Sequence, residues 1–304
     1  MADANPKHLI LPSAREDAAR VREVPATPQT LSPSYRLAFT DTEFLLREEL
    51  RPVRLQLELL KPELELLARR IDSTIVIFGS ARIAEPEKAR ARREAAEAAA
   101  AAAPDDPKLA WAAELARRLE KRSRSYEEAR RFAQLVSTAR RPDGKQRYVI
   151  VTGGGPGIME AANRGAHDVG AISIGHNIVL PHEQAPNPYI TPELCFQFHY
   201  FALRKMHLTT RARALVVFPG GFGTLDELFE ILCLIQTGKS RPMPVLLFDE
   251  AYWRRVIDFE FLAEEGMIDP HDLNIFRFVE TAEQAWEVIR RHYGDIEPEA
   301  APVG

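Results

Sequence analysis

The chain has 304 residues, a formal net charge of −4 and a sequence pI near 6.1, so its overall charge gives no reason to expect nucleic acid or an anionic membrane as a partner. This length is ample for a self-sufficient core in one large domain or two small ones. No segment approaches the ~18–20 continuous apolar residues of a membrane span, and the N-terminus lacks the pattern of a secretion signal. We therefore expect a cytoplasmic location, with Cys195 and Cys233 as buried free thiols.

The first seventy residues divide into two segments of different composition. Residues 1–35 carry five prolines among polar residues, which predicts a disordered tail. Residues 36–70 are rich in Leu, Glu and Arg at helical spacing, and predict an N-terminal helical arm that Pro52 and Pro62 divide into short helices.

From residue 71 onward, apolar strand patterns alternate with helical patterns. The expected strands lie at residues 73–80, 147–152, 171–178, 195–198, 214–218 and 245–249, and the expected helices at 200–212, 225–237, 252–265 and 282–292. Such alternation predicts an α/β fold, with a doubly wound parallel sheet covered by helices on both faces. We expect this domain to span residues 71–293 and a C-terminal tail to occupy 294–304.

A long segment rich in Ala, Arg and Glu separates the first two expected strands. Glu97 alone interrupts the alanines of residues 95–103, and Pro104 and Pro107 close the run. Strong helix formers mixed with both signs of charge predict an exposed helix. Residues 108–140 read as further helix, and Pro142-Asp143-Gly144 reads as a turn.

Three of the expected strands end in glycine-rich turns. Residues 79–82 (G-S-A-R) follow the first strand, residues 153–157 (G-G-G-P-G) the second, and residues 219–223 (P-G-G-F-G) the strand that ends at Phe218. Ligands of such sheets bind beyond the carboxyl ends of the strands. We therefore expect the three turns to converge on one crevice.

The third turn leads directly into an apolar helical pattern, with Thr224 as the expected N-cap. A strand, a glycine turn and a helix N-terminus together bind phosphate, because free N–H groups and the helix dipole both point at the anion. Thr224 and Glu227 also have the spacing of a capping box, which would make Glu227 a structural residue. A cap needs none of the three glycines, so they favour the phosphate site.

Several other motifs fail on inspection. Ile158 stands where a dinucleotide fingerprint needs its third glycine, and Gly238-Lys239-Ser240 ends a helix instead of starting one. Pro186 stands where His182-Glu183 would need the second histidine of a zinc protease. No other His or Cys cluster has metal-ligand spacing, so we assign no metal site.

Arg204-Lys205 lies on the helix before the strand at 214–218, and Glu227 returns to the same sheet edge one strand later. A guanidinium holds an anion bidentately. A carboxylate stabilises a cationic sugar transition state or positions water. The alternative for Arg204 is a cation on a surface helix.

These residues resemble the Lonely-Guy-type phosphoribohydrolases, which activate cytokinins and were once labelled lysine decarboxylases. Residues 219–227 resemble the family signature P-G-G-x-G-T-x-x-E, and Arg204-Lys205 resembles its Arg-Lys pair. Residues 78–82 and 153–159 resemble its other two turns. The likeness runs from about residue 71 to residue 292, and residues 50–63 resemble the N-terminal extension of a longer bacterial branch.

The resemblance implies a Rossmann-like fold, at least a homodimer, and hydrolysis of the N-glycosidic bond of a nucleoside 5′-monophosphate. The products would be a free base and ribose 5-phosphate, and no metal or organic cofactor would be needed. The resemblance makes Arg204 and Glu227 the catalytic pair. The substrate-binding residues that it implies are Gly79, Ser80, Gly154, Gly155, Met159, Glu183, Lys205, Gly220, Gly221, Gly223 and Thr224.

The region from residue 83 to residue 145 is longer than the compact helix of short family members, and could cover the site or extend an oligomer interface. The base stays open between a cytokinin, adenine and a pyrimidine. One alternative function is a nucleotide-binding or cofactor-carrier protein on the same fold without turnover. A pyridoxal-phosphate decarboxylase is a weaker alternative, because Lys205 and Lys239 both lie in polar settings at helix ends that do not suit a Schiff base.

Overall fold

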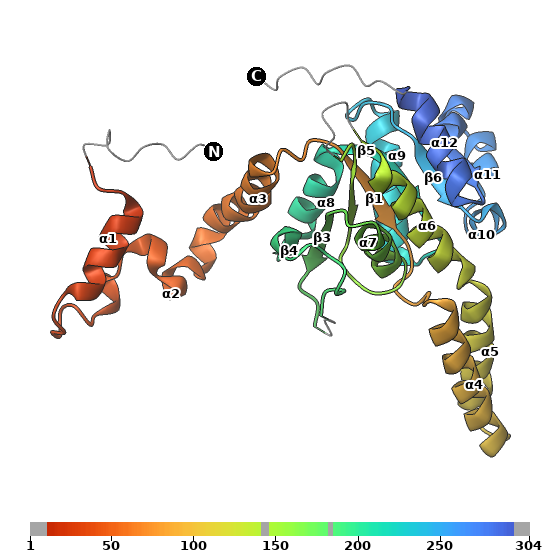
Figure 1. Cartoon of the computed structure of the whole chain (residues 1–304), viewed down its shortest axis with the longest axis horizontal. Coiled ribbons are helices and arrows are strands. Elements are labelled where there is room, and N and C mark those ends of the chain that lie inside the picture. Colours follow the sequence, from red (N-terminus) through yellow and green to blue (C-terminus); the bar gives the residue numbers. More distant parts are fainter. Residues whose placement is uncertain (1–10, 141–145, 182–184, 295–304) are drawn as a thin grey trace. The chain divides into compact units, whose positions relative to one another are not determined.

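The computed structural model describes residues 11–140, 146–181 and 185–294. The chain forms two compact units, Met1–Arg70 and Ile71–Gly304 (Figure 1). Within the described ranges, no helix combines the length and the apolar character that crossing a membrane requires. The Pro142 turn and Glu183 lie outside the described residues.

The first unit consists of short helices followed by one long helix. α1 (Ala14–Arg20) lies within the segment for which the sequence predicts a disordered tail. A helix forms there because Ser13 and Glu16 make a capping box at its start. α2 (Thr42–Leu45) precedes α3 (Arg51–Ala68). α3 continues through Pro62, so the prediction that this proline divides the segment is wrong, whereas α3 does begin beside Pro52 after the shorter helices. Pro52 lies in the first turn, where no N–H donor is needed, and the buried Pro62 is accommodated inside the helix.

The second unit is built on one sheet of seven parallel strands. The strands are β1 (Thr74–Phe78), β2 (Val149–Thr152), β3 (Ser173–Ile178), β4 (Cys195–Phe198), β5 (Ala212–Val217), β6 (Val245–Phe248) and β7 (Phe276–Val279). Their order is β4-β3-β2-β1-β5-β6-β7, and every pairing is parallel. The predicted α/β class and doubly wound sheet are confirmed. β7 was not among the predicted strands, because it is a short edge strand in which only Phe276 and Val279 are buried.

The helices cover the two faces because the chain leaves the centre of the sheet in opposite directions. α6 (Arg124–Thr138), α7 (Ile158–Asp168) and α12 (Ala282–Tyr293) pack together on one face. Right-handed crossovers place α8 (Phe201–Thr210) and α9 (Phe222–Gln236) on the other. The single helix predicted at 252–265 is two helices, α10 (Glu250–Val256) and α11 (Phe259–Glu264), because Asp258 caps the second by accepting from Phe261 N.

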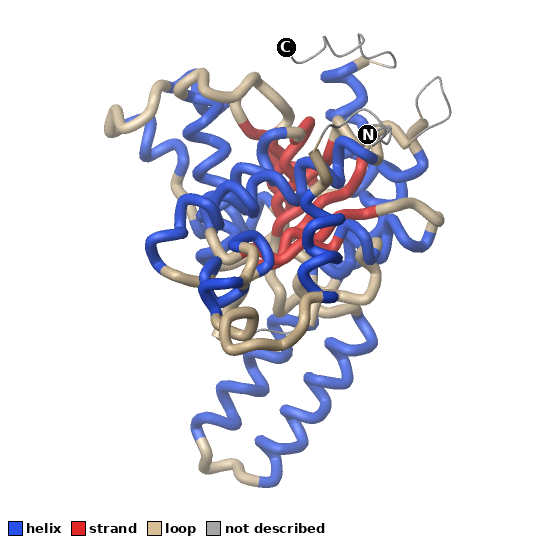
Figure 2. The backbone as a smooth tube through the Cα atoms, turned by 90° about the vertical axis from the view of Figure 1, so that its left-hand side faces the viewer, coloured by secondary structure: helices blue, strands red, loops and turns tan. Residues whose placement is uncertain are grey.

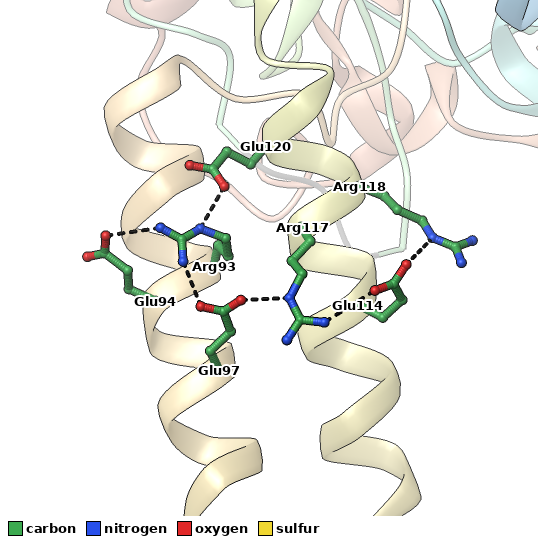
Figure 3. Close-up of polar contacts among 7 residues, drawn as sticks. All are labelled: Arg93, Glu94, Glu97, Glu114, Arg117, Arg118 and Glu120. Carbon is green, nitrogen blue, oxygen red and sulfur yellow. Dashed lines mark hydrogen bonds and ion pairs between the residues drawn. The ribbon is translucent and has the colours of Figure 1, made fainter.

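The alanine-rich insertion forms two helices that lie side by side, α4 (Pro86–Ala102) and α5 (Pro107–Lys121) (Figure 2). Ion pairs join them across their polar faces: Glu97 accepts from both Arg93 and Arg117 at 2.6 Å, and Arg93 also reaches Glu120 at 2.6 Å (Figure 3). Single exposed pairs stabilise little, but this network fixes the register of the two helices.

The sheet order reverses between β1 and β5, which are neighbours at its centre. The chain runs from β1 toward β2 and β3, and from β5 toward β6 and β7. In open α/β sheets, ligands bind at the carboxyl ends of the strands where the order reverses. The glycine turns after Phe78 and Phe218 lie at that point.

Candidate active site

The three glycine turns meet at the carboxyl end of the sheet. Ser80 N donates to Pro219 O at 3.0 Å, which joins the turn after β1 to the turn after β5. Ile158 N donates to Ser80 O at 3.2 Å, which joins the turn after β1 to the turn after β2. Ser80 is therefore the common contact, and the predicted convergence of the turns is confirmed.

Gly157 makes the closest of these approaches. It is the N-cap of α7, with φ of 72°, a conformation that side chains other than glycine rarely adopt. A Cβ atom at this position would lie 2.4 Å from Ser80 O and within 2.8 Å of the Ala81 backbone. Only glycine lets the two turns come this close.

A buried polar network holds the second turn in place. Thr152 Oγ1 accepts from Gly154 N at 3.0 Å and donates to Asn163 Oδ1 at 2.7 Å. Asn187 Nδ2 lies 3.1 Å from both Gly154 O and Gly155 O. Each buried polar group is thus satisfied by a partner that fixes the turn.

Sequence reasoning missed this network. One signal was available, since Asn163 is a fully buried polar residue among the alanines on the inner face of α7. Asn187 gave no comparable signal, because it lies in a loop whose contact with the turn depends on the tertiary fold.

The structure brings Arg204 and Glu227 together. Arg204 Nη2 lies 2.5 Å from Glu227 Oε1, and the two residues are 9% and 3% exposed. Arg204 comes from α8 and Glu227 from the second turn of α9. A Cβ on Gly153 would lie 3.7 Å from Arg204 Nη1, so the pair adjoins the second glycine turn. The alternative of Arg204 as a surface helix cation does not hold.

This ion pair is electrostatically costly to bury. Burial raises the pKa of the Glu227 carboxyl above its ordinary value, and the Arg204 charge offsets part of that shift. Arg204 Nε is buried without a hydrogen-bond partner among the described residues. A buried pair of this kind is weak evidence for a stabilising role. A raised carboxyl pKa and an unsatisfied donor beside a glycine turn are typical of a functional site.

The N-cap of α9 lies three residues earlier than the sequence predicts. Gly221 is the N-cap, so Thr224 is the third residue of the helix and not its cap. The capping-box interpretation of Glu227 is therefore wrong, and its side chain pairs with Arg204 instead. The sequence favoured Thr224 because threonine is a preferred N-cap residue, whereas the helix starts after the extended backbone at Gly221.

The space around this helix start is open. A Cβ at Gly221 or at Gly223 would meet no atom within 4 Å. Thr224, the next residue, is buried. The start of α9 thus borders open space, and the N–H groups of a first helical turn, which have no intrahelical partner, can bind an anion that enters it.

Two other predicted binding residues, Met159 and Lys205, lie in different surroundings. Met159 lies over the second turn, where its sulfur would be 3.0 Å from a Cβ on Gly153. Lys205 turns toward α9, and its Nζ lies 2.7 Å from Asp226 Oδ2 and 3.2 Å from Glu230 Oε2. Burial by itself lowers the pKa of Lys205, but these two hydrogen bonds outweigh it and the pKa is raised. Lys205 therefore does not join the Arg204–Glu227 pair.

Two further predictions concern cysteines and metals. Cys195 is partly exposed and Cys233 is exposed, so the expectation of buried thiols is wrong, although both are free. Cys233 lies on the outer side of α9, and helical periodicity in an apolar sequence did not reveal which side faces the sheet. In the part of the chain that the structure describes, no group of three or more His, Cys, Asp or Glu residues is arranged to hold a metal.

A family model described as "Possible lysine decarboxylase" matches residues 159–289. A cytokinin riboside 5′-monophosphate phosphoribohydrolase from Arabidopsis thaliana is 31% identical over 160 residues, which cover 51% of this chain and 70% of that relative. A probable enzyme of the same name from Oryza sativa subsp. japonica is 30% identical, and the matching region spans 58% of that relative. An enzyme of the same name from Rhodococcoides fascians is 28% identical, and the matching region spans 72% of it.

Among solved structures, the molybdenum cofactor carrier protein of Chlamydomonas reinhardtii is similar with a TM-score of 0.43 and 16% identity. The similar region covers 72% of this chain and 97% of that protein.

Proposed function

This chain belongs to the cytokinin riboside 5′-monophosphate phosphoribohydrolase family, and from that membership we propose that it hydrolyses the N-glycosidic bond of a nucleoside 5′-monophosphate. The substrate would be a cytokinin riboside monophosphate or AMP, and the products a free base and ribose 5-phosphate. The observation that carries the proposal is the buried Arg204–Glu227 pair, 2.5 Å apart, beside the convergent glycine turns.

In the proposed mechanism the phosphate binds at the N-terminus of α9, above Gly221 and Gly223. That anchor holds the ribose so that C1′ lies near Glu227, which removes much of the entropic cost of reaching the transition state. As the C1′–N bond breaks, its electron pair goes to the leaving base and C1′ gains oxocarbenium character, which the Glu227 carboxylate stabilises more than the ground state. Water then adds its oxygen to C1′ and loses one proton, which balances the proton that the leaving base takes up from solvent.

Arg204 has two proposed roles in this scheme. It keeps Glu227 ionised against the effect of burial, because its charge opposes the raised pKa. Its Nε, which has no partner among the described residues, is available to a substrate oxygen. The other residues proposed to contact the nucleotide are Gly79, Ser80, Gly154, Gly155, Met159, Lys205, Gly220 and Thr224, together with Glu183, which lies outside the described residues.

A product assay tests the proposal. The purified chain is incubated with AMP and with isopentenyladenosine monophosphate, and free base and ribose 5-phosphate are quantified by chromatography. Release of both products in equal amounts supports the hydrolase, and the ratio of the two rates reports base preference. Tight binding of nucleotide without any product would support the alternative of a non-catalytic nucleotide-binding or carrier protein.

A change at Gly221 should separate phosphate binding from folding. Gly221→Ala is expected to weaken AMP affinity by about tenfold, because the added methyl group enters the space in which the anion would lie. Its φ of −98° suits any residue, and no protein atom lies within 4 Å of the new Cβ, so the melting temperature should stay the same. Calorimetric titration with AMP and with adenosine in the Glu227→Gln chain, which does not consume the ligand, checks this, and equal loss for both ligands would contradict it.

The pKa of Glu227 should depend on Arg204. We expect the pKa of this carboxyl to lie above 4.5 in the parent chain and to rise further in Arg204→Gln, because the opposing positive charge is gone while burial remains. Since the ionised form is the active one, kcat/KM should fall as the pH falls through this pKa. NMR titration of 13C-labelled glutamate carboxyl groups measures it, with the signal assigned by its loss in Glu227→Gln. An unchanged pKa in Arg204→Gln would contradict the expected coupling.

We also propose that the chain forms at least a homodimer through α8 and α9. Large apolar side chains are exposed on these two helices: Phe222 is 92% exposed, Phe201 50%, Met206 43% and Phe229 39%. Large exposed apolar side chains on neighbouring helices are what an interaction surface would supply. Light scattering at several concentrations would show the mass of a single chain if the proposal is wrong.

A cytoplasmic location is part of the same proposal, and the two free cysteines support it. Cell fractionation of the native host checks it, and recovery of the protein outside the cytoplasmic fraction would contradict it.

A further inference from the structure

A tyrosine from beyond β6 contacts the third glycine turn. The hydroxyl of Tyr252, in the first turn of α10, donates to Gly220 O at 2.5 Å. α10 is anchored close by, because the buried Trp253 donates its Nε1–H to Phe248 O at 2.8 Å. The Tyr252 hydroxyl therefore comes from a fixed element and not from a loop.

Two charged residues hold the Tyr252 ring. The Arg122 guanidinium lies over it, 4.7 Å from the ring centroid. Arg122 Nη1 also lies 2.7 Å from Asp249 Oδ2, and Asp249 Oδ1 accepts from Tyr252 N at 3.0 Å. We call Arg122, Asp249 and Tyr252 the Tyr252 clamp. Each member contacts the other two.

Asp249 is the N-cap of α10, and its backbone lies in the left-handed region, with φ of 70° and ψ of 78°. Few residues other than glycine adopt this conformation, and Asp is one of them. It places the Asp249 carboxylate between Arg122 and the Tyr252 amide.

We propose that the Tyr252 clamp positions the phosphate-binding turn and thereby sets the preference for a monophosphate over a nucleoside. The inference rests on the proposed function. The peptide bond is planar, and in its trans form the carbonyl and the next N–H point in opposite directions. A hydrogen bond that fixes Gly220 O on one side therefore fixes the direction of Gly221 N–H on the other. The backbone at Gly221 borders open space, since a Cβ there would meet no atom within 4 Å.

The clamp also gives the insertion a role at the site. Arg122 is the C-cap residue of α5, so the helical pair α4–α5 ends at the residue that covers the Tyr252 ring. The insertion therefore supplies Arg122, which positions the Tyr252 ring.

The test compares two tyrosines that make the same kind of hydrogen bond. Tyr252→Phe keeps the ring under Arg122 and removes only the hydroxyl, and we expect AMP affinity to fall about three- to tenfold, the usual effect of one hydrogen bond. Adenosine affinity should not change. Tyr293→Phe is the control, because its hydroxyl also donates to a backbone carbonyl, Arg213 O at 2.6 Å, but at the opposite end of β5. AMP and adenosine binding are measured by calorimetry in the Glu227→Gln chain, so that turnover does not consume the ligand.

A second pair of variants tests the charged part of the clamp. Arg122→Ala should lower AMP affinity, as Tyr252→Phe does. Arg118→Ala is the control and should leave AMP affinity unchanged, because Arg118 pairs with Glu114 on its own helix. The proposal is overturned if Tyr252→Phe leaves AMP affinity unchanged, if it weakens adenosine equally, or if the Glu227→Gln chain shows no preference for AMP over adenosine. Because binding is the readout, these outcomes are independent of whether the parent chain hydrolyses AMP.

Discussion

Glu227→Gln is expected to lower kcat on AMP by about 100- to 1,000-fold, the usual effect of removing one group that stabilises transition-state charge. Glutamine has the shape of glutamate and keeps an oxygen that can accept from Arg204, so the buried guanidinium retains a neutral partner. What is lost is the negative charge beside C1′ as the glycosidic bond breaks. Steady-state kinetics on AMP measure the loss, and the AMP dissociation constant should stay within a few-fold of the parent value.

The matched control for this prediction lies one turn further along the same helix. Glu230 also carries a carboxylate that faces α8, where it pairs with Lys205 at 3.2 Å. Glu230→Gln removes the same charge from the same helix without touching the Arg204–Glu227 pair, and should keep kcat close to that of the parent. If Glu227→Gln is as active as Glu230→Gln, Glu227 is a structural residue and the proposed mechanism fails.

Gly157→Ala is expected to reduce both the stability of the second unit and its nucleotide binding. The new Cβ would lie 2.4 Å from Ser80 O and close to the Ala81 backbone, and these are backbone atoms that cannot rotate away. The positive φ, with ψ of −128°, lies in a region that side chains rarely occupy and adds about 1–3 kcal/mol of strain. We expect the free energy of unfolding to fall by at least about 2 kcal/mol, measured by urea denaturation, and AMP binding to be lost because the first two turns move apart.

Gly170→Ala separates backbone strain from this steric effect. Gly170 also has a positive φ, 68°, but a Cβ there would meet nothing within 4 Å. The variant should lose only the strain energy and should bind AMP as the parent does. Equal effects on AMP binding at both positions would show that the contact between Gly157 and Ser80 does not organise the site.

Structural features that depend on residues adjacent in the chain were predictable from the sequence. The strand that ends at Phe78 and the glycines that follow it stand next to each other in the chain, so an apolar run and a turn suffice to locate them. The approach of Arg204 to Glu227 also followed, because one helix and one strand separate them and parallel topology returns both to the same sheet edge.

Features that depend on backbone conformation or on distant partners were not predictable in this way. Thr224 is the better N-cap by composition, yet the extended backbone at Gly221 starts α9. Pro62 has the composition of a helix break, yet its ring is buried within α3. Asn187 and Tyr252 act on glycine turns far from them in the sequence, and a single sequence carries no record of such contacts.

The long insertion between β1 and β2 has a consequence for how the sheet assembles. Ile75 lies opposite Ile150 on one side and Ala214 on the other, so the central strand is synthesised long before either of its neighbours. Pairing over such separations is slow, because the intervening chain must be ordered first. Yet α4 and α5 fold back on each other through local contacts, and Arg93 joins Glu120 across them. The insertion thus brings its own ends close together. Once α4 and α5 have formed, the flexible chain that must close between β1 and β2 is much shorter than the number of residues between them, and the entropic cost of closing it is lower.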